Sequence, residues 1–219
     1  MLKSENNHLR FDLSVIASWI VKNSRVLDLG CGEGELLTYL QTHKQVIGSG
    51  IDNKEANVLK CIEKGLSVIQ GDINSEVEDY PDFAFDYVIL SQTLQQVYAP
   101  SELIRSLLQI GKKVIVSFPN FSHWRARLQL LFTGYAPVTA QLPYEWYNTP
   151  NIRVITLKDF RKYAKKIGFG IIKQAAIATE REESQGKIVR FFPDLLASYG
   201  IFLIGNQNTK VGLDHRFGH

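Results

Sequence analysis

Three glycines at alternate positions give the clearest sign of chemistry in this 219-residue chain. They lie in the run Asp28-Leu29-Gly30-Cys31-Gly32-Glu33-Gly34, between a short apolar segment and a segment with helical spacing. Glycines in such a turn let the backbone bend sharply and lie close to a ligand that any Cβ atom would push away. The strand–turn–helix context therefore predicts a ligand-binding loop.

The charge around this loop indicates which ligand it holds. Dinucleotide-binding loops follow the pattern GxGxxG and place a pyrophosphate on the amino terminus of a helix. Here the third glycine comes one residue early, Asp28 leads the turn, and Glu33 and Glu35 add negative charge. These acids disfavour an anionic ligand, whereas S-adenosylmethionine carries a sulfonium and an amino group. We therefore expect S-adenosylmethionine, or its product S-adenosylhomocysteine, in this loop.

Two more acids follow later strands of the expected fold. Asp52 follows the second strand, where a carboxylate can accept hydrogen bonds from both ribose hydroxyls. Asp72 follows the third strand in Gln70-Gly71-Asp72-Ile73, where it can accept a hydrogen bond from the adenine amine. Each acid taken alone is equally compatible with a surface carboxylate or a helix N-cap. Three acids at three successive strand ends, beside a glycine turn, favour a nucleoside site.

Alternating strands and helices must position these residues. Apolar residues recur at helical spacing over residues 9–20, which predicts a leading amphipathic helix. The expected strands are 25–29, 45–51, 67–70, 85–90 and 113–118, and the expected helices are 35–42, 54–64 and 100–110. Helices between strands imply parallel pairing with right-handed crossovers, hence a doubly wound α/β sheet. Ligands of such sheets bind beyond the carboxyl ends of the strands, where the glycines and acids fall.

The second half of the chain has a different character. Residues 121–131 have helical spacing, and residues 169–178 and 198–204 are expected to form a closing strand pair. Thr156 and Asp159 form a variant capping box before another helix. We expect one domain over residues 1–205 with an aromatic, proline-rich insertion at 133–151, followed by a flexible tail at 206–219.

Composition excludes several classes of function. Lys and Arg number 25 against 22 Asp and Glu, and this net charge of +3 is too small to indicate nucleic-acid binding. Cys31 and Cys61 lack the spacing of a zinc site or a disulfide framework, so we expect packing roles and no metal. No run approaches the roughly 18 apolar residues that span a bilayer, and the amino terminus has no signal-peptide core. A cytoplasmic protein without membrane contact is expected.

Several segments beyond the glycine loop carry a family resemblance. They are SQTLQ (91–95), VSFPNF (116–121), HW (123–124) and LPYEWYNTPNI (142–152). With the segment 24–37, they closely resemble the methionine biosynthesis protein MetW family, and the first 120 residues or so resemble class I S-adenosylmethionine-dependent methyltransferases. The resemblance implies a Rossmann-like seven-stranded sheet, mostly parallel with a closing antiparallel strand. It implies these cofactor-binding residues: Asp28, Gly30, Gly32, Gly34, Asp52, Asp72 and Ser91.

The family resemblance also implies a biological role. MetW-like proteins are associated, as a required partner, with homoserine O-acyltransferase, which acylates the hydroxyl of homoserine at the first committed step of methionine biosynthesis. We therefore expect this chain to bind that enzyme and to support or activate it. Adenosylmethionine is formed downstream from methionine, so a pocket for it beside the first enzyme of the pathway would suit feedback.

The residues leave open whether the chain is itself a catalyst. Many small-molecule methyltransferases carry histidines after the fourth strand, where this chain has Leu94-Gln95-Gln96-Val97. Glutamine cannot act as a general base near neutral pH. Of the five histidines only His123 directly follows a strand end, and its neighbour Trp124 favours a packing role. We assign no catalytic residue, and a genuine S-adenosylmethionine-dependent small-molecule methyltransferase is the alternative, because transfer from a sulfonium needs alignment more than a base.

The aromatic insertion at 133–151 bears on the same choice. It contains four aromatic residues and three prolines, with Glu145 as its only charge. Such a composition is typical of the centre of a protein interface, of a lid over a cofactor or of irregular core. We favour an interface with the acyltransferase through Tyr144, Trp146 and Tyr147. Three basic residues flank the insertion as an expected polar rim: Arg125, Arg127 and Arg153.

Overall fold

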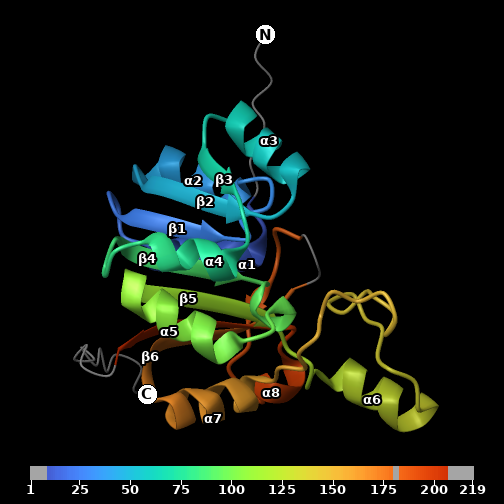
Figure 1. The fold of residues 1–219 in the computed structure, drawn as a ribbon. Coiled ribbons are helices and arrows are strands. Elements are labelled where there is room, and N and C mark those ends of the chain that lie inside the picture. Colours follow the sequence, from blue (N-terminus) through green and yellow to red (C-terminus); the bar gives the residue numbers. More distant parts are fainter. Residues whose placement is uncertain (1–8, 180–182, 207–219) are drawn as a thin grey trace.

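One mixed sheet forms the centre of the computed structural model, which describes residues 9–179 and 183–206 (Figure 1). Eight strands lie in the order β3-β2-β1-β4-β5-β8-β6-β7. Their bounds are β1 Arg25–Leu29, β2 Ile47–Asp52, β3 Ser67–Gln70, β4 Phe85–Ser91, β5 Gly111–Pro119, β6 Phe169–Ala178, β7 Lys187–Ile188 and β8 Tyr199–Asn206.

The pairing of the strands confirms the doubly wound α/β class. Strands β1 to β5 pair in parallel, and β8 runs antiparallel to both of its neighbours, β5 and β6. The expected count of seven strands was wrong, because β7 adds an eighth beside the end of β6. Both residues of β7 are exposed, and two residues are too few to produce the alternating pattern by which a strand is recognised.

Helices cover both faces of the sheet (Figure 1). The longer ones are α1 (Phe11–Trp19), α2 (Glu35–Lys44), α3 (Glu55–Glu63), α5 (Pro100–Ile110), α6 (Trp124–Thr133) and α7 (Leu157–Ile167). Short turns are α4 (Ile73–Glu76), η1 (Val77–Asp79), η2 (Leu94–Gln96) and α8 (Pro193–Leu196). The capping box before α7 is confirmed, since Thr156 Oγ1 accepts a hydrogen bond from Asp159 N at 3.1 Å.

Alternation along the strands produces two apolar cores. In β4, Val88 and Leu90 pack into one cluster with α5 and α7, whereas Tyr87 and Ile89 pack into a second with α1 and α2. Successive side chains of a strand point to opposite faces, so a strand buried on both sides is apolar throughout. This burial fixes the register and therefore brings the ends of the parallel strands to one edge, called the carboxyl edge below.

Residues 124–151, called the arm below, stand apart from the sheet. Figure 1 shows α6 and the loop that follows it projecting to one side of the layered body. Ala126 is the one buried residue of α6, whereas α5 buries five. The helix expected at 121–131 begins later, because Asn120 Oδ1 accepts hydrogen bonds from Ser122 N and Ser122 Oγ, which holds this stretch in a turn.

The end of the expected tail lies outside the described residues. Asn206 itself ends β8, and its Nδ2 donates to Leu108 O at 3.2 Å. Within the described ranges, no helix combines the length and the apolar character needed to cross a membrane.

Candidate functional site

The glycine loop forms the strand-to-helix turn that its sequence predicts. It leaves β1 at Leu29 and enters α2 at Glu35. Gly30, Gly32 and Gly34 have φ values of +74°, +57° and +76°, a left-handed conformation that only glycine adopts readily. Gly30 N donates to Ile51 O at 2.7 Å, and this hydrogen bond holds the turn against the end of β2.

The three glycines have different surroundings. A Cβ on Gly34 would lie 2.2 Å from Leu66 Cδ1, and one on Gly30 would lie 2.7 Å from Thr93 Oγ1. A Cβ on Gly32 would meet no atom within 4 Å. Gly34 and Gly30 are therefore required for packing, and Gly32 presents bare backbone to open space where a ligand could approach.

Asp28 is the most perturbed carboxyl group of the loop. Its side chain is 3% exposed, and its Oδ1 is buried without a hydrogen-bond partner within the described residues. Burial, and then the charge of Asp52, raise the pKa of Asp28 to about 7, against a smaller opposing effect of Arg10. A cation placed beside Asp28 would supply the missing partner.

Asp52 holds the turn from the neighbouring strand. Its Oδ2 accepts a hydrogen bond from Gly32 N at 2.8 Å, and its Oδ1 accepts from Lys54 N at 2.9 Å and Asn57 Nδ2 at 3.0 Å. A carboxylate has about four acceptor positions, so about one is left for a ligand hydroxyl. The structure thus brings Asp28, the glycine loop and Asp52 into one cluster.

Asp72 follows β3 and Ser91 ends β4, so both lie on the carboxyl edge, with β2 and β1 between their strands. Asp72 is exposed and caps α4 by accepting a hydrogen bond from Asn74 N at 2.8 Å, as the N-cap alternative predicted. Ser91 ends β4, and its Oγ shares a hydrogen bond of 3.0 Å with Ser117 Oγ. In the described part of the chain, neither side chain bonds to the glycine loop.

Glu33 does not play the role expected of it. Its carboxylate is exposed and pairs with the ammonium of Lys60, while Lys64 Nζ donates to Glu33 O at 2.6 Å. This pairing neutralises the charge that was expected to repel a pyrophosphate. The electrostatic preference for a cationic ligand therefore depends on Asp28, Asp52 and the exposed Glu35.

One buried polar group beside the site was not predicted from the sequence. Asp12 is 4% exposed, accepts two hydrogen bonds from Arg10, and accepts another from Gln92 Nε2 at 2.6 Å. This network ties α1 to the turn after β4. Nothing in the sequence distinguishes Asp12 from an ordinary acid in the first turn of a helix, because its partner Gln92 lies 80 residues away.

The cysteines have the packing role expected of them. Cys31 and Cys61 are buried and unoxidised, and Cys61 Sγ donates to Gly32 O at 3.3 Å. Burial raises the pKa of both thiols, which disfavours the reactive thiolate. The described residues contain no group of three or more His, Cys, Asp or Glu side chains that could hold a metal ion.

This sheet order and glycine turn define a Rossmann-like fold of the methyltransferase type. A solved structure from Thermotoga maritima, described as an S-adenosylmethionine-dependent methyltransferase and possible histamine N-methyltransferase, is similar with a TM-score of 0.63. The alignment covers 92% of this chain and 91% of that chain at 16% sequence identity. At this identity the likeness establishes the fold and says nothing of the reaction.

Sequence comparison identifies the family. The model of the methionine biosynthesis protein MetW family matches residues 10–204, and the chain belongs to that family. A "bifunctional methionine biosynthesis protein MetXA/MetW" of Rhodopirellula baltica is 35% identical over 162 residues, 70% of this chain. A "ubiquinone biosynthesis O-methyltransferase" of Yersinia enterocolitica is 30% identical over 111 residues, 48% of this chain. The chain spans 26% of the length of the first relative and 46% of the second.

Gly34 and Gly32, which differ in the free space available to a Cβ atom, give a first prediction. Gly34→Ala should lower the free energy of unfolding by about 2–4 kcal/mol, because it adds a clash with Leu66 to a left-handed φ. Gly32→Ala should cost only about 1 kcal/mol, since it adds backbone strain without a clash. Chemical denaturation of both variants measures the difference, and equal losses would contradict this account of the turn.

The raised pKa of Asp28 gives a second prediction, on stability against pH. Below about pH 3.9, the pKa of Asp28 in the unfolded chain, the carboxyl group is neutral in both states and its contribution to the free energy of unfolding is greatest. As the pH rises toward 7, the unfolded chain ionises more readily than the folded protein, so this contribution is lost. Asp28→Asn should therefore stabilise the protein at pH 8 by up to about 4 kcal/mol, with little effect at pH 4. Denaturant titrations at the two pH values provide the measurement.

Asp86 is a matched control of opposite sign. Its pKa is lowered, chiefly by the hydrogen bond from Lys112 and then by that from Arg25 N. Asp86→Asn should therefore reduce stability at pH 8. If Asp28→Asn also reduced stability there, Asp28 would not be the unpaired buried carboxylate described here.

Proposed function

We propose that this chain binds homoserine O-acyltransferase and supports or activates it in cytoplasmic methionine biosynthesis. The observation that carries the proposal is the Rhodopirellula relative, whose name joins MetXA and MetW in one polypeptide. Fusion holds two modules at high effective concentration, and separate chains need an interface to achieve the same association. The match covers 26% of that relative, which leaves ample length for a second module.

The arm offers an interface of suitable chemistry. Trp146 and Tyr147 are 76% and 70% exposed, and their rings pack edge to face with centroids 5.8 Å apart. Tyr144 is 39% exposed beside them. Rings that filled the protein core would be buried, so their exposure favours the interface over the core interpretation. Aromatic side chains with few charges dominate the binding energy of interface centres.

The expected rim of arginines is mostly engaged elsewhere. Arg153 donates to the carbonyls of Val97 and Tyr98, and Arg127 Nε donates to Ser122 O at 2.7 Å. The proposed interface therefore depends on apolar contact. Exposed side chains of α6 extend the apolar surface; they are Leu128, Leu130, Leu131 and Phe132.

We further propose that the carboxyl edge binds S-adenosylmethionine or S-adenosylhomocysteine. The unpartnered Oδ1 of Asp28 and the open space beside Gly32 support a cationic ligand at the loop. Asp52 would hold the ribose, with Gly30 and Gly34 shaping the turn. Asp72 would hold the adenine, and Ser91 would line the end of β4. When bound, adenosylmethionine supplies an electrophilic methyl group.

Hydrogen bonds connect the turn after β4 to the base of the arm, and this connection would allow the ligand to regulate the partner. Gln95 O, in the turn after β4, accepts hydrogen bonds from Ile152 N and Arg153 N, both at 3.0 Å. These two residues directly follow the arm. A ligand that shifts the turn after β4 would therefore move the base of the proposed interface, which suits sensing of a product of methionine.

Independent methyl transfer is the second candidate, and the fold together with the Yersinia relative favours it. Against it, Gln95 is buried and donates to Gln92 O at 2.6 Å, so it supplies no base. Burial, and then Arg125, lower the pKa of His123, which keeps its imidazole neutral, but His123 lies after β5 and lines a cavity that does not include the glycine loop. The partner role is thus the better-supported proposal.

The partner role yields a direct prediction for acyltransferase turnover. Adding the chain to purified homoserine O-acyltransferase should raise turnover. The double substitution Trp146→Ala with Tyr147→Ala should reduce the affinity of the complex at least about 30-fold, because interface aromatics each contribute about 1–2 kcal/mol or more. Turnover against chain concentration, with acetyl and succinyl donors, gives both quantities.

Phe83→Ala is the matched control for this experiment. Phe83 is 51% exposed and precedes β4, at the opposite end of the strands from the arm. It should leave the complex unchanged. Unaltered turnover on mixing would refute the partner role, and transfer of a labelled methyl group by the chain alone would establish the alternative.

A further inference from the structure

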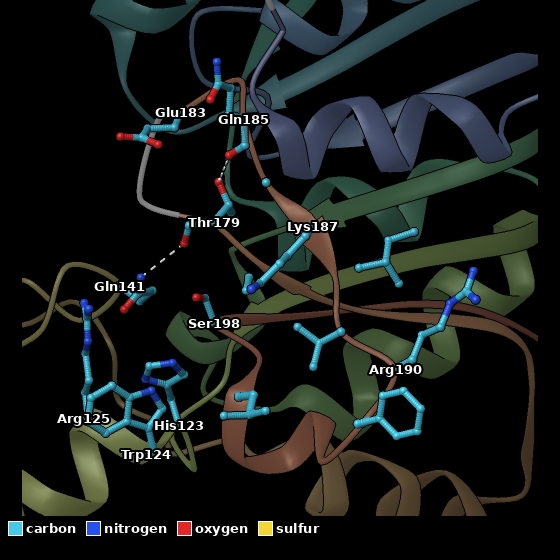
Figure 2. A pocket seen from close by; sticks show the side chains of 16 residues that line it. His123, Trp124, Arg125, Gln141, Thr179, Glu183, Gln185, Lys187, Arg190 and Ser198 are labelled. Carbon is cyan, nitrogen blue, oxygen red and sulfur yellow. Dashed lines mark hydrogen bonds between the residues drawn. The ribbon is translucent and has the colours of Figure 1, made fainter.

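A large cavity lies apart from the glycine loop. Its volume is about 840 Å³, within the usual range for small-molecule sites. It lies between the start of α6, the β6–β7 hairpin and α8, and Figure 2 shows its lining. The lining includes neither the loop nor Asp52, Asp72 or Ser91. Because β6 and β5 run in the same direction, the cavity opens at the carboxyl edge, on the opposite half of the sheet.

Two cationic side chains from different elements converge on this cavity. Figure 2 shows Lys187, from β7, extending toward Ser198, and Arg125, from α6, extending along the opposite wall toward Gln141. The ammonium group of Lys187 makes no ion pair or hydrogen bond within the ranges the structure describes. Arg125 lies over the ring of Trp124, with 5.5 Å between its Cζ and the ring centroid. The lining acid, Glu183, lies at the end away from His123 (Figure 2).

His123, which lines the cavity, also carries an unpartnered polar atom beneath the surface. Nδ1 of His123 is buried and has no hydrogen-bond partner among the described residues. His123 is the N-cap of α6, and no side chain caps that helix. Helix amino termini favour negative charge, so this wall adds to the effect of the two cations. Polar atoms buried without partners are uncommon in proteins.

The remaining walls are largely apolar. Their apolar lining residues include Trp124, Ile188, Phe191 and Leu196. Apolar walls with a few convergent polar groups are the usual construction of a small-molecule site, in which the polar groups fix orientation. An ion alone would leave these walls in contact with water, so they indicate a ligand with an apolar body.

We propose that this cavity binds a small organic anion, a carboxylate or phosphate joined to an aromatic or other apolar body. Arg125 and Lys187 hold the anionic group, and Trp124 and Ile188 cover the apolar body. A sulfonium nucleoside would be repelled here, because both converging side chains are cations. The site is therefore separate from the proposed adenosyl site and goes beyond the proposed function.

Titration of the full chain with four probes tests the proposal. Benzoate and phenyl phosphate carry the two kinds of anion, inorganic phosphate lacks an apolar body, and benzyl alcohol lacks a charge. Trp19→Phe with Trp146→Phe leaves Trp124 as the one tryptophan, whose fluorescence reports occupancy. We expect benzoate or phenyl phosphate to change this fluorescence saturably, and to bind at least about tenfold more tightly than benzyl alcohol or inorganic phosphate.

Substitutions at the two cations locate the binding. Lys187→Met and Arg125→Met should each weaken the better aromatic anion at least about tenfold, as measured by calorimetry. Lys158→Met removes an exposed lysine of α7 outside the cavity and should have no effect. Melting temperatures establish that each variant is folded. Absence of saturable binding, equal affinity for benzyl alcohol, or binding unchanged in both cation variants would overturn the proposal.

Discussion

A buried carboxylate oxygen, Oδ1 of Asp28, with no hydrogen-bond partner among the described residues is the constraint on which the site depends. Asp28 lies at the carboxyl end of a central strand, and removing a charge from water is costly unless another group compensates for it. The sheet offers no such group, because apolar side chains fill both of its faces. Three left-handed glycines and the hydrogen bond from Gly32 N to Asp52 shape the turn that follows it. The arrangement suits an incoming cation.

The charged side chains at the carboxyl edge differ in sign between the two halves of the sheet. Asp28 and Asp52 lie on the half formed by β1 and β2, whereas Arg125 and Lys187 line a cavity on the half that contains β6 and β7. The arm leaves the sheet between β5 and β6 in the chain, so it is connected to both halves. Such a layout allows one protein to contact a partner and to respond to two chemically different small molecules, each recognised by charge.

Sequence patterns predicted the central sheet well because burial fixes them. The bounds of β1 and α5 agree with prediction, as each buries apolar residues in a segment with clear ends. The glycine loop and Asp52 were also placed correctly. The pairing of Glu33 with Lys60 was not foreseen, because it joins residues 27 positions apart on exposed surfaces. Strand β7 and the cavity were not predicted either, because both depend on how the β6–β7 hairpin folds over the end of β6.

The central claim is that the glycine loop, with Asp28 and Asp52, selects a positively charged nucleoside. Isothermal titration of the full chain at pH 7.5, with S-adenosylmethionine in one series and NAD in another, tests it most directly. The account predicts saturable binding of S-adenosylmethionine that Asp28→Ala abolishes, and no binding of NAD. Binding of NAD in place of S-adenosylmethionine would contradict it.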